Sequence, residues 1–228
     1  MIDLYFDIET IPDQAPDALE IIQDGLKAPA QYKKPDSIAE WHKTKGAEAA
    51  AEKHAKTALQ GISGEICSIA WALGQNPVKG IIRRPGDPEA TLLSDFFLSV
   101  MAENEELTKN EHFTPPHPKF RWVGHNVIEF DLRFLKQRCW INNVQSPFMI
   151  PADAKHGGDF VFDTMREWAG WKGYVSQDAL CKAFGLDGKP GMSGADVWPY
   201  YQAGRYTEIL DYNKDDVRAV REIKEMMF

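Results

Sequence analysis

The feature that most constrains the fold is an alternation of apolar and polar side chains over residues 2–9. Every second position is apolar: Ile2, Leu4, Phe6 and Ile8. A period of two predicts a β-strand with one face in a core. Because side chains alternate across a strand, Asp7 and Glu9 project together from the opposite face. The sequence thus predicts a strand that presents two carboxylates near its end.

Further strands and helices follow along the chain. Nearly continuous apolar character predicts a strand covered on both sides at residues 66–73. Shorter strands are predicted at 78–84 and 120–124, and helices at 88–103, 130–140, 176–184 and 206–227. Asp87 is the predicted N-cap of the first of these helices, with Pro88 at its first position. Strands first, with helices between and after them, predict an α/β domain with a mixed sheet.

Residues 11–61 do not fit this frame. Four prolines lead into a stretch rich in alanine and lysine, residues 37–59, which has high helix propensity but a thin apolar face. We interpret 11–61 as a helical insertion within a single domain that spans residues 1–228.

Composition narrows the class of protein. An apolar content of 43% and seven tryptophans indicate a packed globular chain. No apolar run is long enough to span a bilayer, and the three cysteines are far apart, as is typical of reduced thiols in a cytoplasmic protein. We therefore expect a cytoplasmic protein without membrane contact.

The formal net charge of −8 argues against a protein that coats nucleic acid through its phosphates. It is compatible with an enzyme that gathers several carboxylates in one cleft. Substrate affinity of such an enzyme should depend strongly on divalent cations.

Five residues are candidates for that cleft, and each has an ordinary structural alternative. Asp7 and Glu9 alone are weak evidence, since strands often carry acids on a solvent face. Asp131 stands where a strand meets a helix, a position typical of a helix N-cap. Tyr212 and Asp216 are four residues apart and share a helix face, where the tyrosine would suit a core. Asp216, however, falls on the apolar stripe of its helix, where an unpaired charge is costly.

Three segments, Phe6–Thr10, Asn126–Asp131 and Tyr212–Asp216, resemble in order and placement the three exonuclease motifs of the DEDD superfamily. A tyrosine four residues before the last aspartate is similar to the DEDDy branch, which includes proofreading domains of DNA polymerases. The long insertion after the first motif resembles predicted stand-alone exonucleases related to family B proofreading domains. The resemblance implies an RNase H-like fold, a mixed β-sheet flanked by helices, with a helical insertion after the first strand.

The activity implied by the resemblance is a two-metal-ion 3′–5′ exonuclease. It would hydrolyse phosphodiester bonds at the 3′ end of single-stranded DNA and release nucleoside 5′-monophosphates. Two Mg²⁺ or Mn²⁺ ions would be held by Asp7, Glu9, Asp131 and Asp216, because hard cations prefer carboxylate oxygen. By family analogy Asp7 bridges both ions, Asp131 holds the second ion through water, and Tyr212 orients the attacking water.

Further residues are candidates for contacts with the substrate. Thr10, Asn126 and Phe130 are expected to grip the terminal nucleotide, whereas His125 is expected to be structural or to lie beside the substrate. The segment 189–194 resembles a loop that approaches the substrate in related exonucleases. Several basic residues could contact the phosphates of a single nucleic-acid strand, and each of them is equally well explained as solvated surface charge. These candidates are Lys33, Lys34, Arg83, Arg84, Arg133, Lys136 and Arg138.

Two other functions stay open at this point. One is a 3′–5′ exoribonuclease with the same mechanism. The other is a non-catalytic binding module, which the presence of all four acids and the tyrosine disfavours. A replication or repair protein is a further expected partner, and it would bind through the 11–61 insertion.

Overall fold

A computed structural model of the protein describes residues 1–109, 118–155, 157–187 and 191–227. Its centre is a five-stranded sheet with the order β3-β2-β1-β4-β5. β1 is antiparallel to β2, as β2 is to β3, whereas β1, β4 and β5 run parallel. The strands are β1 (Ile2–Ile11), β2 (Glu65–Leu73), β3 (Lys79–Ile82), β4 (Phe120–Gly124) and β5 (Val161–Asp163). The predicted mixed sheet is confirmed, and β5 is a strand that the sequence pattern did not predict.

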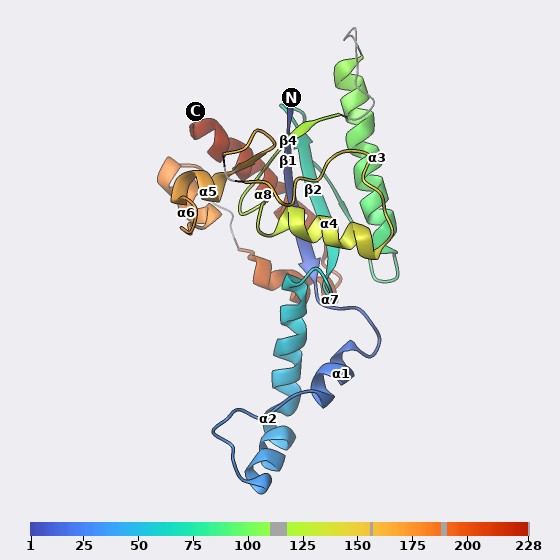
Figure 1. Ribbon diagram of the computed structural model, residues 1–228, viewed down its shortest axis with the longest axis vertical. Helices are drawn as coiled ribbons and strands as arrows, with labels where there is room; N and C mark the ends of the chain where they lie inside the picture. Colours follow the sequence, from blue (N-terminus) through green and yellow to red (C-terminus); the bar gives the residue numbers. More distant parts are fainter. Residues whose placement is uncertain (110–117, 156, 188–190, 228) are drawn as a thin grey trace.

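Helices cover both faces of the sheet (Figure 1). On one face, α3 (Glu89–Thr108) and α4 (Asp131–Ile141) enclose the largest apolar cluster, which contains Phe6, Trp71 and Trp122. The rings of Phe6 and Trp122 form a T-shaped contact with 5.0 Å between their centroids. On the other face, α8 (Tyr206–Met226) packs Val217 and Val220 against the centre of the sheet. The alternation in β1 therefore separates an aromatic core from the face that α8 covers.

The start of α3 differs from the prediction. The helix begins at Glu89, and Pro88 occupies the N-cap position. Asp87 does not cap it, because its carboxylate instead accepts the backbone N–H of Arg84 at 2.8 Å. The role expected of Asp87 was wrong, because a tight turn before Pro88 uses its side chain.

Three short helices follow β5 and precede α8: α5 (Thr164–Ala169), α6 (Gln177–Phe184) and α7 (Val197–Gln202). The Asp163 carboxylate caps α5 by accepting the N–H groups of Met165 and Arg166. Ser176 caps α6, which ends at Gly185 in the left-handed conformation, in agreement with the helix predicted at 176–184. A single 3₁₀ turn, Gly194–Asp196, introduces α7.

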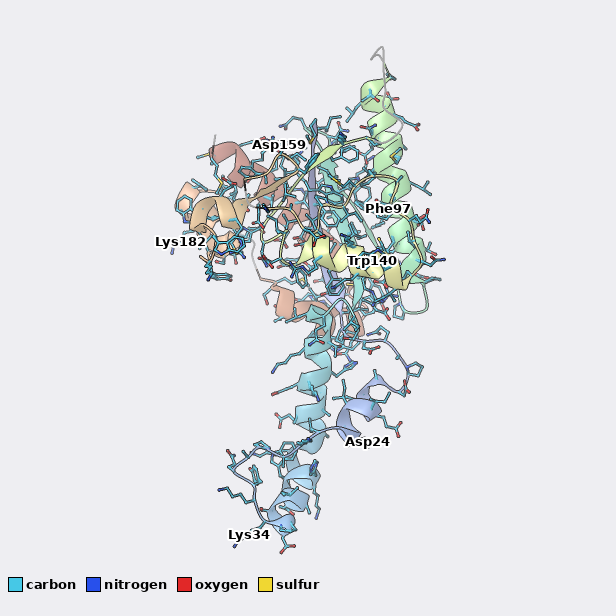
Figure 2. All side chains as sticks on the ribbon, in the orientation of Figure 1. Asp24, Lys34, Phe97, Trp140, Asp159 and Lys182 are labelled. Atoms are coloured by element: carbon cyan, nitrogen blue, oxygen red, sulfur yellow. The ribbon has the colours of Figure 1, made fainter. Side chains whose placement is uncertain are left out.

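Between β1 and β2 the chain forms an arm that projects away from the sheet (Figure 1). The arm contains α1 (Ala18–Asp24), the 21-residue helix α2 (Pro35–Ala55) and a 3₁₀ turn, Lys56–Leu59. Ile11 pairs directly with Glu65 in the sheet, so the arm is an extended connection between two hydrogen-bonded neighbours. Figure 2 shows that Asp24 and Lys34 lie far from the sheet.

Within the described part of the chain, none of the helices combines the length and apolar character needed to cross a membrane. Cys67, Cys139 and Cys181 are buried, and these three form no disulfide.

Candidate active site

Three of the predicted carboxylates meet between β1 and α8. Asp7, Glu9 and Asp216 each offer an oxygen, and these oxygens lie within 4.8 Å of one another. Glu9 and Asp216 are buried, and Asp7 is half-buried. Residues separated by more than 200 positions in the chain thus form one acidic cluster.

Strand geometry explains why Asp7 and Glu9 both belong to this cluster. They are two apart on β1, on the face that also presents Tyr5 to α8. The register against β2 shifts between Glu9 and Thr10, which is the signature of a β-bulge. Bulges occur often beside active sites, where they change the aim of a side chain.

A residue that the sequence analysis missed, Asn213, connects the cluster to the sheet. Its side chain is fully buried, and its Nδ2 donates to Oδ2 of Asp7 at 2.6 Å. Its Oδ1 accepts the hydroxyl of Ser68 on β2 at 2.8 Å. Asn213 therefore fixes the orientation of one Asp7 oxygen. The helical stripe through Ile209 and Asp216 includes position 213, so helix periodicity was the signal that could have identified it.

Asp131 lies beside the cluster and is not part of it. It is the first residue of α4, but it does not cap the helix, because its Oδ1 accepts the N–H of Ile8 at 3.1 Å. β4 ends at Gly124, so the edge of β1 beyond it needs another acceptor, which Asp131 supplies. Burial, then the charge of Asp7 and that of Glu9, raises the pKa of Asp131 well above its ordinary value.

Tyr212 lies one helical turn before Asp216, half-buried against the apolar cluster of Ile11, Tyr201 and Ile209. Burial first, then the charges of Glu9 and Asp7, raises the pKa of its hydroxyl far above the ordinary value. The hydroxyl therefore keeps its proton at neutral pH. It is both a packed tyrosine and a neighbour of the acidic cluster.

The turn between β4 and α4 is fixed by hydrogen bonds to the side chain of Asp163. Its carboxylate accepts the N–H of Asn126 at 2.9 Å and that of Ile128 at 3.2 Å. Asn126 has a φ of 58°, the left-handed region that asparagine tolerates better than most residues. The turn that leads to Asp131 therefore has a fixed backbone. The sequence analysis missed Asp163, because it predicted neither β5 nor α5.

Both ring nitrogens of His125 make structural contacts. Nδ1 lies 2.9 Å from Oγ1 of Thr164, and Nε2 lies 2.9 Å from the carbonyl oxygen of Val175. The histidine thereby ties β4 to α5 and to the loop after it.

Thr10 is half-buried beyond the register shift, and Phe130 is half-buried against the main core.

Two of the basic residues named as candidate contacts for a nucleic-acid strand are not available for it, and that prediction was wrong. Arg83 is buried, donates to the carbonyl of Ile66 at 2.9 Å and pairs with Glu65. Arg138 is buried against Glu89 at 2.7 Å. Each guanidinium is used inside the fold. The remaining candidates are exposed or half-buried, namely Lys33, Lys34, Arg84, Arg133 and Lys136. Of the segment 189–194, Lys189 and Pro190 lie outside the described residues, and Met192 packs against the cluster around Ile11.

The donor set of the acidic cluster fits a hard divalent cation. All three groups are carboxylates, which suit Mg²⁺ or Mn²⁺ better than softer metals. Two like charges about 4 Å apart at an effective dielectric near 20 repel by about 4 kcal/mol. Bringing three carboxylates together in a partly buried site therefore favours a cation or a bound proton.

With this geometry established, comparison with known proteins assigns the family. A model of predicted 3′–5′ exonucleases related to the exonuclease domain of PolB matches residues 66–220, more than half of the chain. The chain belongs to this family. The match includes Asp131, Tyr212 and Asp216, and it begins after the strand that carries Asp7 and Glu9.

The fold of this exonuclease-family protein is similar to part of a polymerase. The structure of the family B DNA polymerase from the hyperthermophilic archaeon Pyrobaculum calidifontis matches with a TM-score of 0.56 and 14% sequence identity. The match covers 100% of this chain and 24% of the polymerase chain. The RNase H-like fold expected from the motifs is thereby confirmed. No curated protein matches the chain.

Proposed function

We propose that the protein is a 3′–5′ exonuclease that hydrolyses the terminal phosphodiester bond of single-stranded DNA and releases nucleoside 5′-monophosphates. The observation that carries this proposal is the meeting of Asp7, Glu9 and Asp216 within 4.8 Å, in a fold and family of exonucleases. Tyr212, one turn before Asp216, and Asp131, at the edge of β1, complete the proposed site.

Two divalent cations, Mg²⁺ or Mn²⁺, would be held by Asp7, Glu9 and Asp216, with Asp131 contributing to the second ion through water. When bound, they supply Lewis acidity and lower the pKa of a water molecule. Asn213 keeps one oxygen of Asp7 in a single orientation through its 2.6 Å hydrogen bond. The fold thus orients this oxygen of Asp7 before any cation binds.

Tyr212 acts as a hydrogen-bonding group and not as a base. Burial raises the pKa of its hydroxyl, and the ordinary value near 10 already keeps a tyrosine protonated at neutral pH. A protonated phenol next to Asp216 can both accept a hydrogen bond from water and donate one to a phosphate oxygen. It would therefore orient the attacking water toward the terminal phosphate.

The test is degradation of a 5′-labelled oligonucleotide with Mn²⁺. A ladder that shortens from the 3′ end, with nucleoside 5′-monophosphates as product, supports the proposal. Asp216→Asn is the matched control and should abolish the ladder. A wild-type protein that binds Mn²⁺ and oligonucleotide without cleaving it would instead indicate a binding module.

RNA is the alternative substrate for the same site. DNA and RNA oligonucleotides of one sequence, with different labels, should be mixed in one reaction. Faster shortening of the DNA supports the proposal as stated. Faster shortening of the RNA would replace it with an exoribonuclease of the same mechanism.

For the arm we propose a partner-binding role, with a replication or repair protein as partner. Supporting it are exposed apolar side chains on and beside its helices, Leu19, Ile21, Leu59 and Ile62. Because Ile11 pairs with Glu65, deletion of the outer arm should leave the sheet and the exonuclease activity intact.

We further propose that the protein acts in the cytoplasm. Its three cysteines are buried and form no disulfide, which suits a reducing compartment.

A further inference from the structure

Exposed aromatic side chains gather at the end of α5 and in the loop between α5 and α6. Four large aromatic side chains of the described residues are exposed, and three of them, Trp168, Trp171 and Tyr174, lie within seven positions. Trp171 is 68% exposed and Tyr174 is 81% exposed. Exposed aromatic rings gathered in one place indicate a binding surface.

The backbone beneath these rings is fixed. Nη1 of Arg166 donates to the carbonyl of Trp171 at 2.7 Å and to that of Gly173 at 3.4 Å. The carbonyl of Val175, at the other end of the loop, lies 2.9 Å from Nε2 of His125. A Cβ at Gly173 would come within 2.0 Å of the carbonyl oxygen of Ala169, so the loop passes too close to α5 for any other residue. The rings are exposed because the fold holds them there.

A depression of about 280 Å³ lies beside Trp171. Three cationic side chains, Arg133, Lys155 and Arg166, and two carboxylates, Glu129 and Asp153, line it. Arg133 and Arg166 both lie near the carboxylate of Glu129, at 3.4 Å and 3.9 Å. Arg133 and Lys155 are exposed, and the five formal charges of the lining sum to +1, in a chain whose net charge is −8.

The same depression adjoins the turn that leads into the proposed active site. Ile128 and Glu129 contribute to its lining, and both belong to the turn between Asn126 and Asp131. His125, which holds the end of the aromatic loop, immediately precedes that turn. A chain lying across this surface would thus reach the segment that carries Asp131.

We propose that Trp171 and Tyr174, with the cations of the adjoining depression, form a stacking platform for single-stranded polynucleotide upstream of the 3′ end. The inference rests on the proposed function and specifies how its substrate is held. Bases stack on aromatic faces without regard to sequence, while nearby lysine and arginine contact the phosphates. Because every base has a π-face, this combination suits a processive or sequence-tolerant exonuclease.

The test compares Trp171→Ala and Tyr174→Ala with Trp140→Ala. Trp140 is 70% exposed, on the part of α4 that runs toward α3, away from α5 and α6 (Figure 2). Binding of a fluorescent oligothymidylate of about 20 nucleotides, measured by anisotropy with Ca²⁺, should weaken at least about fivefold for each platform variant. Trp140→Ala should bind like the wild type, and Trp171→Phe should retain most of the affinity. Cleavage of a dinucleotide, too short to reach the platform, should be unchanged in all four variants.

Platform variants that bind the long oligonucleotide as tightly as Trp140→Ala would overturn the inference, and the exonuclease proposal would survive if cleavage persisted. Equal losses on the dinucleotide and the long oligonucleotide would also overturn it, since they would indicate a disturbed active site. If the wild type cleaves nothing but loses oligonucleotide affinity with Trp171→Ala, the platform stands and the proposed catalytic function fails.

Discussion

Two of the sites where carboxylates are buried, Glu89 and the acidic cluster, differ in what surrounds the charge. Glu89 at the start of α3 is surrounded by donors: the guanidinium of Arg138 at 2.7 Å, the amide of Asn142 at 2.6 Å and the N–H of Ile66 at 2.7 Å. Asp7, Glu9 and Asp216 instead lie against one another within 4.8 Å. The sequence distance between partners is long in both cases.

The difference separates a structural carboxylate from a functional one. Glu89 has its counter-charge inside the fold, so it joins α3, α4 and β2 and needs nothing from outside. The acidic cluster concentrates like charge, and a bound cation or proton reduces this repulsion. Removal of one carboxylate should therefore have opposite effects on stability at the two places.

The largest expected effect is loss of activity on replacing one carboxylate of the cluster. In Asp216→Asn, cleavage of single-stranded DNA should fall by more than about 100-fold, because loss of a partner that only supports a metal ligand already costs up to about that much. In EDTA the same variant should be more stable than the wild type, since one repelling charge is gone. Oligonucleotide cleavage and urea unfolding measure the two effects. If the variant keeps a tenth of the wild-type activity, Asp216 is not part of the active site.

Glu89→Ala should show the opposite pattern. It leaves the guanidinium of Arg138 buried without its carboxylate, which is expected to lower the free energy of unfolding by about 3–5 kcal/mol. Urea unfolding with and without Mn²⁺ checks this, and the loss should be equal in both. Glu208→Ala, which breaks the exposed pair with Arg205, is the matched control and should change stability little. A small loss for Glu89→Ala would mean that the buried pair is dispensable.

Asn213→Ala tests whether the acidic cluster needs the hydrogen bond from Asn213 to function. Loss of the hydrogen bond to Asp7 should weaken Mn²⁺ binding or activity by about 10–100-fold, the usual cost of removing a partner of a metal ligand. Calorimetric titration with Mn²⁺ and the cleavage rate measure it. Ser68→Ala removes only the next bond outward and should have a smaller effect. Equal effects of the two changes would point to general disruption of the helix α8 and sheet contact.

The smallest effect concerns the pH dependence of stability in EDTA. The pKa of Asp131 is raised in the folded state, so the folded protein holds this proton more tightly than the unfolded chain. Its contribution to stability is full below the unfolded pKa of about 3.9 and is lost as pH rises through the folded pKa. When the pH is raised from about 5 to about 8, the free energy of unfolding should therefore fall less for Asp131→Asn than for the wild type. Urea midpoints at both pH values decide this, and an unchanged difference would contradict it.

Local patterns in the sequence predicted much of the fold. Period-two alternation predicted β1 and the shared face of Asp7 and Glu9, because side-chain direction in a strand follows from backbone geometry alone. Helical spacing placed Tyr212 and Asp216 on one face of α8 for the same reason. The three motifs in order identified the superfamily, and comparison confirmed the exonuclease family and the fold.

Only the tertiary structure decided which polar groups meet. Asp131 could have been a helix cap, and it became an acceptor for Ile8 because β4 ends before β1 does. Arg138 looked like a surface cation, and packing turned it toward Glu89. Partners in such contacts are set by how strands and helices cross, over separations in sequence that no local pattern spans. The sequence thus determined which carboxylates could share a face, and the packing of α8 on β1 determined that three of them do.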